Sequence, residues 1–324
     1  MTKAITFDRF GGPEVLHWGE VEPGEPGEGM LRVRHTAVGL NFIEVYQRIG
    51  LYPVDLPSGL GQEAAGIVEA VGPGVTEFKP GDRIAYGSGP PGAYAEARLI
   101  PADKVVPLPE GIDDRSAACL MLKGMTAQYL LHRTYAVQPG DTVLVHAAAG
   151  GVGTLLSQWA RHRGAVVIGT AGSEEKAAIA HAHGCHHVIQ YRRESFVDKV
   201  REITEGRGVN VVYDGVGKAT FEGSLDCLRR LGMMVSFGNA SGTVDAVNPL
   251  DLARRGSLFF TRPSLGHYTT TREELLATTK SLFDAVLAGA IKVEIGQTYP
   301  LSEAAQAHRD LEARNTTGAT VLLP

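Results

Sequence analysis

A glycine-rich segment between a β-branched run and a helical run has the clearest chemical meaning in this sequence. In VHAAAGGVGTLLSQWA (145–160), Gly150 and Gly153 occupy the second and third glycine positions of G-x-G-x-x-G, and Ala148 replaces the first. Glycine at the second position lets the backbone approach a pyrophosphate, and glycine at the third lets helix and strand pack closely. The helix N-terminus then offers N–H groups to the anion. A turn that binds nothing is the alternative. However, the segment follows the first strand of a long series of alternating strands and helices, and this position favours a dinucleotide site.

The end of the next β-branched run bears on which dinucleotide is bound. An NAD site would place Asp or Glu there, about 20 residues after the glycines, to bind the ribose hydroxyls. This sequence has Gly172 and Ser173 instead, and Lys176 follows one turn later. Ser173 and Lys176 can bind a 2′-phosphate with charge-assisted hydrogen bonds, so the pattern predicts NADPH. A solvated lysine on the first helical turn is the alternative for Lys176. Tyr191, at the end of the third run, is predicted near the adenine ribose.

Strands and helices alternate after Asp113 and would position these residues. Six short β-branched-rich runs predict strands at 141–148, 165–170, 187–191, 209–214, 233–238 and 257–261. Helices are predicted between them, near 152–163, 173–183, 195–205 and 218–230. Such runs favour a parallel sheet covered on both faces, which is the doubly wound α/β architecture of the Rossmann fold.

The region before Asp113 has a different rhythm. Alternating runs cut by Gly and Pro predict strands at 30–40, 64–72, 82–86, 93–100 and 104–108, typical of a small antiparallel barrel. One helix is expected over 41–50. At the other end of the chain, helices at 272–289 and 302–312 and a strand at 317–324 are expected to return to the first domain. The expected domains are therefore 1–123, 124–263 and 264–324.

Composition excludes several classes of protein. The 324 residues suggest two domains, and 31 basic against 36 acidic side chains give a net charge of −5, so there is no overall basic field for nucleic acid. The three cysteines stand far apart, which excludes a disulfide framework and a four-thiolate zinc lobe. Asp8 and Arg9 interrupt any signal peptide, and no run of 18 apolar residues occurs. We expect a soluble protein of the reducing cytoplasm.

The segment HAHGCHH (181–187) has a composition that elsewhere indicates metal binding. His181 and His183 lie two residues apart on a predicted helix, so they do not share a face. Gly184 then ends that helix. A solvated helix end is the favoured interpretation.

Several longer matches accompany the glycine-rich segment: GDTVLVHAAAGGVGTLLSQWAR (140–161), GLNFIEVYQRIGLYP (39–53), PSGLGQEAAG (57–66), MLKGMTAQYLL (121–131), VVYDGVG (211–217), SFGNASG (236–242) and TRPSL (261–265). With them the whole chain resembles the quinone oxidoreductase and ζ-crystallin group of the medium-chain dehydrogenase/reductase superfamily. The resemblance implies a GroES-like β-barrel domain before the Rossmann domain. Zinc-dependent members bind catalytic zinc with a thiolate and with the His of a G-H-E motif, but the corresponding residues here are Asn41 and Gln62. Amides do not replace such ligands, so no metal is expected.

The same resemblance implies a set of contacts with NADPH. Those on the nicotinamide side are Asn41, Lys123, Thr126, Tyr129, Phe237, Gly238, Asn239, Pro263, Ser264 and Leu265, with Tyr46 beside them. Arg314 is expected to close over the cofactor. Those on the phosphate and adenosine side are Gly150, Gly151, Val152, Gly153, Gly172, Ser173, Lys176 and Tyr191.

Three residues that the family places around the substrate pocket are the candidate catalytic groups. The Tyr46 and Tyr52 phenols could donate to an oxyanion forming on a quinone, and the Arg262 guanidinium could neutralise it. Core packing of the tyrosines and an ion pair of Arg262 with an acid are the alternatives. None need be an obligatory acid, because a quinol can take its proton from water.

Three functions remain open at this point. The first is an NADPH-dependent quinone reductase, and the second is a zinc-free reductase of the double bond of alkenals or enones, with the same cofactor site. The third is a structural, crystallin-like role or binding of AU-rich RNA, against which the net charge of −5 argues weakly. An apolar last strand at 257–261 would tend to pair with a copy of itself, so a homodimer is expected.

Overall fold

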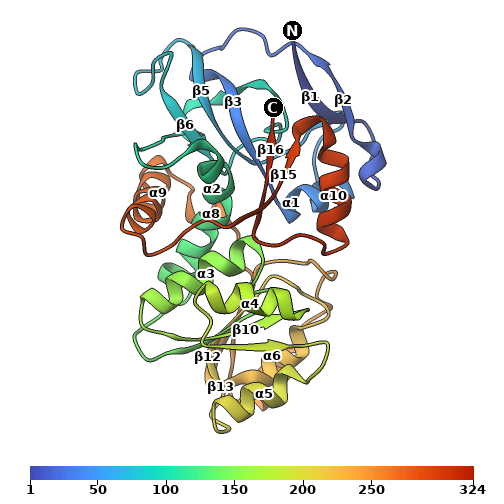
Figure 1. Cartoon of the computed structure of the whole chain (residues 1–324), viewed down its shortest axis with the longest axis vertical. Helices are drawn as coiled ribbons and strands as arrows, with labels where there is room; N and C mark the ends of the chain where they lie inside the picture. Colours follow the sequence, from blue (N-terminus) through green and yellow to red (C-terminus); the bar gives the residue numbers. More distant parts are fainter. The chain divides into compact units, whose positions relative to one another are not determined.

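The computed structural model describes all 324 residues and divides them into two compact units (Figure 1). The first unit comprises Met1–Met125, Thr269–Leu287 and Val293–Pro324, and the second comprises Thr126–Tyr268 and Ala288–Lys292. The chain therefore enters the second unit near the expected boundary at 123 and leaves it a few residues beyond the expected boundary at 263.

A six-stranded parallel sheet forms the centre of the second unit. Its spatial order is β11-β10-β9-β12-β13-β14, which is the order 3-2-1-4-5-6 of a Rossmann fold and confirms the predicted doubly wound sheet. The buried β-branched and aliphatic residues of the inner strands explain why both faces need cover. The strands are β9 (Thr142–Val145), β10 (Val166–Ala171), β11 (His187–Gln190), β12 (Val209–Asp214), β13 (Leu228–Ser236) and β14 (Phe259–Thr261).

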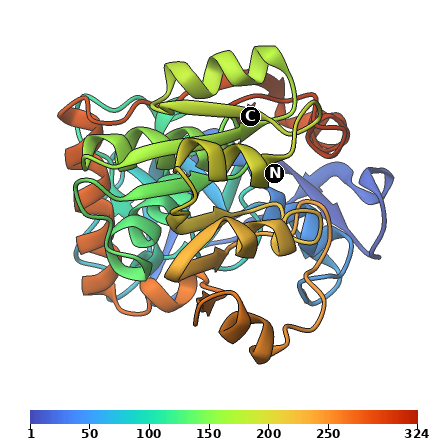
Figure 2. The same ribbon diagram turned by 90° about the horizontal axis from the view of Figure 1, so that it is seen from below.

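Helices cover both faces of this sheet, as Figure 2 shows. The helix α3 packs beside α4, and α5 packs beside α6. The helices of the second unit are α3 (Gly151–His162), α4 (Glu174–Ala182), α5 (Phe196–Ile203), α6 (Phe221–Cys227), α7 (Pro249–Arg254) and α8 (Leu265–Tyr268).

The predicted helix at 218–230 is wrong at both ends. The structure has a helix only over Phe221–Cys227, and Leu228 already begins β13. At the start, the carboxylate of Asp214 accepts hydrogen bonds from the N–H of Gly217 and the hydroxyl of Thr220, which holds those residues in a turn. At the end, Leu228 pairs with Val209, and residues 228–230 belong to β13 although their side chains favour a helix.

The first unit contains two sheets, mostly antiparallel, as expected for a GroES-like barrel. The larger sheet has the order β15-β16-β3-β5-β6-β8, with β7 also on β3, and the smaller sheet has the order β2-β1-β4. The last strand, β16, pairs antiparallel with β3, so the end of the chain does return to this unit (Figure 1). The strands are β1 (Thr2–Phe7), β2 (His17–Val21), β3 (Met30–Leu40), β4 (Ser58–Gly59), β5 (Glu63–Val71), β6 (Arg83–Tyr86), β7 (Ala97–Pro101), β8 (Val106–Pro107), β15 (Ile295–Pro300) and β16 (Ala319–Leu323).

Four α-helices belong wholly or partly to the first unit: α1 (Phe42–Arg48), α2 (Asp114–Tyr129), α9 (Arg272–Leu287) and α10 (Ala304–Glu312). The sequence patterns did not predict α2. Residues 117–121 of this helix are buried on every side, so the helix has no polar face and no amphipathic period. A π-helical turn at Leu130–Thr134 follows it.

A buried arginine connects α1 with α10 in the first unit. The Arg48 side chain is 1% exposed, and its guanidinium donates to Nδ1 of His308 (2.8 Å) and to the carboxylate of Glu312 (2.7 Å). Because an arginine is always protonated, Nδ1 of His308 must accept, and Nε2 then carries the proton and faces the Tyr94 hydroxyl (3.2 Å). Burial, with a smaller contribution from Arg48, lowers the pKa of His308 to about 3.

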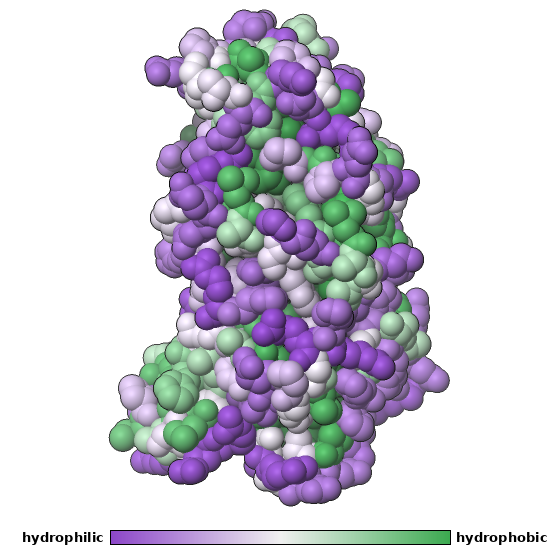
Figure 3. All heavy atoms as spheres, turned by 90° about the vertical axis from the view of Figure 1, so that its left-hand side faces the viewer, coloured by the Kyte–Doolittle hydropathy of each residue, from purple (hydrophilic) through white to green (hydrophobic).

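No helix is long and apolar enough to cross a membrane. On the face drawn in Figure 3, apolar residues lie in separate patches among hydrophilic ones rather than in a continuous band.

The neutral His308 predicts a loss of stability in acid. An unfolded chain protonates this histidine below its ordinary pKa of 6.5, whereas the folded protein does not until about pH 3, so stability falls as pH drops from 6.5. We expect H308Q, whose amide can keep both hydrogen bonds, to reduce this slope by up to about 1.4 kcal/mol per pH unit. Urea unfolding at pH 4 to 7 measures it, with H162Q, a surface histidine, as the control. Equal slopes in H308Q and the wild type would contradict the prediction.

Candidate cofactor and active site

The N-terminus of α3 lies at the carboxyl end of β9 and has no side-chain cap. Gly150 is the N-cap residue, and it provides no side-chain hydrogen bond to the N–H groups of the first turn. By contrast, Ser173 caps α4 and Ser195 caps α5 with their hydroxyls. In the strand order of this sheet, the direction of the connections reverses between β9 and β12, which is where open α/β sheets bind ligands. The first turn of α3 thus presents N–H groups and a partial positive charge where an anion can bind.

The glycine-rich turn depends on close packing at Gly153. A Cβ atom there would lie 2.3 Å from the carbonyl oxygen of Ala147 and 2.8 Å from Cα of Ala148. Any larger residue would push α3 away from the turn. The sequence-based explanation of this glycine therefore matches the geometry, and the binding role of Gly150, Gly151, Val152 and Gly153 remains a prediction.

The structure brings the four predicted adenosine-side residues to one corner of the sheet. Gly172 and Ser173 follow β10, and Tyr191 follows β11, which is the parallel neighbour of β10. A Cβ atom at Gly172 would lie 2.8 Å from the Tyr191 hydroxyl, so the tyrosine packs directly over the glycine. The Ser173 hydroxyl accepts from the N–H of Lys176 (3.3 Å), which fixes the lysine on the first turn of α4.

An additional cation reaches the same corner. The guanidinium of Arg193 lies 3.9 Å from the carboxylate of Glu174, the residue after Ser173, and both side chains are largely exposed. The sequence analysis missed Arg193, because it lies in the turn after β11 and belongs to no phosphate-binding motif. Only its place shortly after Tyr191 could have indicated it.

Asp214, at the carboxyl end of β12, organises the next turn of this edge. It is fully buried, and its carboxylate accepts hydrogen bonds from the N–H of Val216 (2.7 Å) and Gly217 (3.0 Å). Its backbone carbonyl accepts from the N–H of Phe237 (2.8 Å), the first residue after β13. Asp214 therefore has a structural role that positions the segment Phe237, Gly238 and Asn239.

The candidates after β13 and β14 also meet. With the Asn239 amide oriented to satisfy both groups, its nitrogen donates to the carbonyl of Gly238 (3.0 Å) and its oxygen accepts from Arg262 (3.2 Å). Arg262 follows β14, and Pro263, Ser264 and Leu265 continue from it into α8. The remaining candidates of this unit are Thr126 and Tyr129 on α2, and the Tyr129 ring stacks on that of Tyr268 (4.3 Å between centroids).

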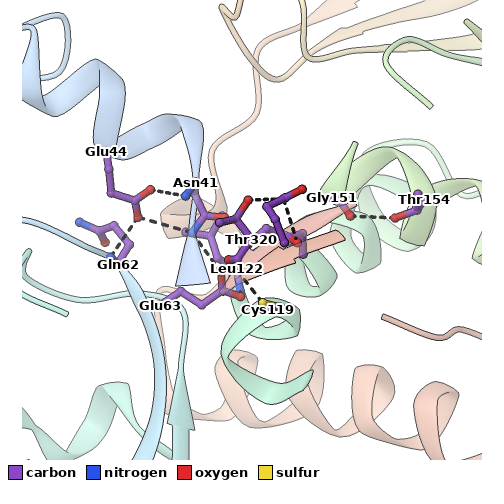
Figure 4. A network of polar contacts seen from close by, with 12 residues as sticks. Asn41, Glu44, Gln62, Glu63, Cys119, Leu122, Gly151, Thr154 and Thr320 are labelled. Carbon is purple, nitrogen blue, oxygen red and sulfur yellow. Dashed lines mark hydrogen bonds and ion pairs between the residues drawn. The ribbon is translucent and has the colours of Figure 1, made fainter. Parts of the chain in front are cut away.

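In the first unit, Asn41 and Lys123 meet at the buried carboxylate of Glu63. Figure 4 shows Asn41 and Glu63 side by side. The Lys123 ammonium lies 2.8 Å from Oε2 of Glu63, and the Asn41 amide donates to the same oxygen (3.0 Å). Oε1 of Glu63 accepts from the N–H of Leu122 (2.9 Å). Glu63 itself is on β5 and its partners come from α2 and the start of α1, so one carboxylate connects three elements.

A second buried carboxylate, that of Glu44, lies on the other side of Asn41 (Figure 4). It accepts from the backbone N–H of Asn41 (2.5 Å) and from the backbone N–H of Gln62 (3.1 Å). The Asn41 amide also reaches it (3.4 Å) and so bridges the two carboxylates. The sequence analysis named neither Glu44 nor Glu63 as a site residue. Glu44 is the N3 residue of α1 after an Asn at the N-cap, and this capping spacing was the available signal.

Burial controls the charges of this cluster. Burial lowers the pKa of Lys123 most strongly, but Glu63, Cys119 and Glu44 together raise it more, so the net pKa lies above the ordinary value and the ammonium is retained. Burial raises the pKa of Glu44 to about 8, against the opposing effect of Lys123 and of the hydrogen bonds from Asn41. The cluster can therefore hold one fixed positive charge and one fixed negative charge, with Glu44 as its titrating member.

The remaining candidates of the first unit are the two tyrosines and Arg314. Tyr46 lies on α1 and is 7% exposed, and its ring is 5.2 Å from that of Tyr52, centroid to centroid. The backbone N–H of Tyr52 donates to the carbonyl of Tyr46 (3.0 Å), which fixes the pair. Arg314 lies just after α10, in the left-handed backbone region (φ 62°).

The histidine-rich segment 181–187 has local partners. Nδ1 of His183 lies 2.8 Å from the carbonyl of Ile179, Nδ1 of His181 lies 3.3 Å from the carbonyl of Cys185, and Nδ1 of His186 accepts from the N–H of Val167 (3.0 Å). No group of three or more His, Cys, Asp or Glu in the structure is arranged to hold a metal ion.

Two family models match the chain. Residues 27–110 match the alcohol dehydrogenase GroES-like domain, and residues 151–280 match the domain described as zinc-binding dehydrogenase.

Several characterised proteins are similar over the whole chain. The sequence is 53% identical over 325 residues to the quinone oxidoreductase of Pseudomonas aeruginosa, with 100% of both chains covered. It is 50% identical over 331 residues to the 2-haloacrylate reductase of a Burkholderia species, with 100% of this chain and 99% of that protein covered. The crystal structure of Escherichia coli quinone oxidoreductase complexed with NADPH is 50% identical, with a TM-score of 0.97 over 99% of this chain and 100% of that chain.

The Glu63–Lys123 pair is expected to be essential for stability. K123M would leave the Glu63 carboxylate buried without its cation, which costs about 3–5 kcal/mol of unfolding free energy. The double variant K123M/E63Q removes both charges and should recover part of this loss. Urea unfolding measures both, with K280M, which breaks a surface pair with Asp284, as the control expected to change stability by less than about 1 kcal/mol. A double variant no more stable than K123M would contradict this account.

Proposed function

We propose, on the premise that this chain belongs to the quinone oxidoreductase family, that it is an NADPH-dependent quinone reductase that acts without a metal. The observation that carries the proposal is the uncapped N-terminus of α3 at the switch point of the sheet, followed one strand later by Ser173 and Lys176 with no acid at the ribose position. The full-length similarity to quinone oxidoreductases, one of them crystallised with NADPH, supports it.

The residues present fit a dinucleotide with a 2′-phosphate. The N–H groups of Gly151 and Val152 would bind the pyrophosphate, and the absence of a side chain at Gly150 would let the backbone approach it. Ser173 and Lys176 would bind the 2′-phosphate, and Tyr191 would pack against the adenosine. Asn41, Lys123, Thr126, Tyr129, Arg314 and the segments 237–239 and 263–265 would contact the nicotinamide side. When bound, NADPH supplies the hydride.

To reduce a quinone, this chain mainly has to position the quinone and stabilise the negative charge that forms on it. The Tyr46 and Tyr52 phenols would donate hydrogen bonds to the oxyanion that forms on the quinone, and the Arg262 guanidinium would stabilise its charge. The contact between Asn239 and Arg262 orients the guanidinium. The final proton can come from water, so we infer that no single side chain is indispensable.

One relative favours a second candidate function. The 2-haloacrylate reductase is 50% identical over the full chain, as similar as two of the quinone oxidoreductases. Its name describes the reduction of an activated alkene rather than a quinone. A double-bond reductase that uses the same cofactor residues is therefore the alternative, and the shape of the substrate pocket would distinguish the two.

We also propose a homodimer that acts in the cytoplasm. The strand β14 is the edge of the parallel sheet, and Phe259 on it is 56% exposed, which suits pairing with a second copy. Sedimentation showing only monomer at micromolar concentration would refute the dimer. The three free, buried thiols suit a reducing compartment.

The proposed activity predicts a substrate order. With NADPH as donor, we expect 1,4-benzoquinone and 9,10-phenanthrenequinone to be reduced with a kcat/KM at least tenfold above that of 2-chloroacrylate or an alkenal. The decrease in NADPH absorbance measures each rate. The reverse order would favour the double-bond reductase, and no oxidation of NADPH with any acceptor would refute both functions.

Lys176 predicts the preference for NADPH over NADH. A charge-assisted hydrogen bond to the 2′-phosphate contributes about 1.5–3 kcal/mol, so K176A should weaken NADPH binding by roughly 10- to 150-fold. NADH binding, which lacks that phosphate, should change by less than about twofold. Calorimetric titration measures both constants, with K199A on α5 as the control. If K176A weakened the binding of NADPH and NADH equally, Lys176 would not be the residue that recognises the 2′-phosphate.

A further inference from the structure

Three exposed apolar side chains of the first unit lie at or beside Gly50, which follows α1. Phe10, Ile49 and Leu51 are 45%, 47% and 39% exposed. Two of them flank Gly50, just after the end of α1, and the third lies in the turn after β1. Single exposed apolar residues are normal on a protein surface, but three of them gathered at one glycine are a candidate binding surface.

Gly50 joins these side chains into one surface. A Cβ atom at Gly50 would lie 3.0 Å from Cγ of Phe10 and within 3.3 Å of two further ring atoms, so the phenyl ring rests directly on the glycine. Gly50 also has φ of 78°, which lets the chain turn sharply after the helix. We name the surface formed by Phe10, Ile49, Gly50 and Leu51 the apolar rim.

The buried Arg48 holds the apolar rim in place. The N–H of Gly11 donates to the carbonyl of Arg48 (3.1 Å), and Nε of Arg48 donates to the carbonyl of Gly11 (3.1 Å). The residue next to Phe10 is therefore fixed to the residue next to Ile49 by two reciprocal hydrogen bonds. The same guanidinium is anchored to His308 and Glu312, as described above. An exposed phenyl ring that is held rigidly can bind an apolar group with little loss of entropy.

The apolar rim continues into the tyrosine pair proposed to hold the quinone ring. Leu51 directly precedes Tyr52, whose N–H donates to the carbonyl of Tyr46 (3.0 Å) and whose ring lies 5.2 Å from the Tyr46 ring. The apolar rim therefore begins one residue along the chain from the tyrosine pair. A substituent attached to a ring that is bound at this pair could contact the rim. The rim itself contributes no charged side chain to that path.

We propose that the apolar rim is a subsite for an apolar side chain carried by the quinone, so that alkyl- or prenyl-substituted quinones are the preferred substrate class. The inference rests on the proposed function and extends it from the quinone ring to its substituent. Burial of several methylene groups against Phe10 and Leu51 is the interaction that would discriminate such substrates from short ones.

Two quinones that differ only in the chain provide the test. They are 2,3-dimethoxy-5-methyl-1,4-benzoquinone and the same ring with a 6-decyl chain, both in detergent below its micellar concentration. We expect the decyl compound to have a KM at least tenfold lower in the wild type, with a similar kcat. The variants F10S and L51S should each reduce this advantage at least threefold and leave the KM of the short quinone unchanged. L276S, which removes an equally exposed leucine on α9, is the matched control.

The outcomes separate the subsite from the proposed function. If both quinones are reduced with equal KM, or if F10S and L51S keep the full advantage, the subsite is refuted while the quinone reductase stands. If neither quinone is reduced, the proposed function itself fails. A change of the sedimentation coefficient in F10S would show that a second copy covers the rim, and loss of binding to phosphatidylcholine vesicles in F10S would show a lipid surface; either result overturns the proposal.

Discussion

The carboxylate of Glu63 is the interaction on which the first unit's candidate site depends. It is fully buried, and its three donors come from two other elements: the Asn41 amide at the start of α1, and the Leu122 N–H and Lys123 ammonium of α2. A buried charge of this kind is tolerated only while every donor is in place, because its desolvation is otherwise uncompensated. The positions of α1, which carries Tyr46, and of α2, which carries Lys123, are therefore coupled through one side chain at the first residue of β5.

In the second unit the controlling constraint is close approach of backbone atoms rather than charge. At Gly153 the carbonyl of Ala147 occupies the space of a Cβ, and at Gly172 the Tyr191 hydroxyl does so. Both glycines lie at the carboxyl edge of the parallel sheet, where β9 and β10 end. Asp214 then fixes the β12 turn by accepting two backbone N–H groups. The edge is thus built from close packing at glycines and from hydrogen bonds to backbone N–H groups, which is a suitable scaffold for holding phosphates.

Local patterns predicted strands in both units well where the strand is a continuous apolar or alternating run: β3 of the first unit and β12 of the parallel sheet have the predicted bounds of 30–40 and 209–214. The helix α2 escaped prediction because it is buried all round, and the predicted helix at 218–230 was too long because β13 already begins at Leu228, where sheet pairing overrode helix propensity. For the site, motif positions indicated the residues that follow β9 and β10. The sequence analysis did not identify Glu44 and Glu63 as site residues. The role of Glu63 depends on its contact with Lys123, which is distant in the chain, so no local pattern could indicate it.

The Glu44–Glu63 cluster holds a fixed positive charge, and its donor groups explain why. The Asn41 amide nitrogen and the Lys123 ammonium direct protons, not lone pairs, toward the carboxylates. The positive charge at this point is therefore covalently part of the chain, and it is retained because Glu63 raises the pKa of Lys123. A fixed cation of this kind needs no loading and cannot dissociate, but it stays effective only in a rigid framework, since displacing it from Glu63 would expose an unpaired charge on both sides. The buried Arg48 gives the far end of α1 the same kind of anchoring, so both ends of the helix that carries Tyr46 are held by buried charged groups.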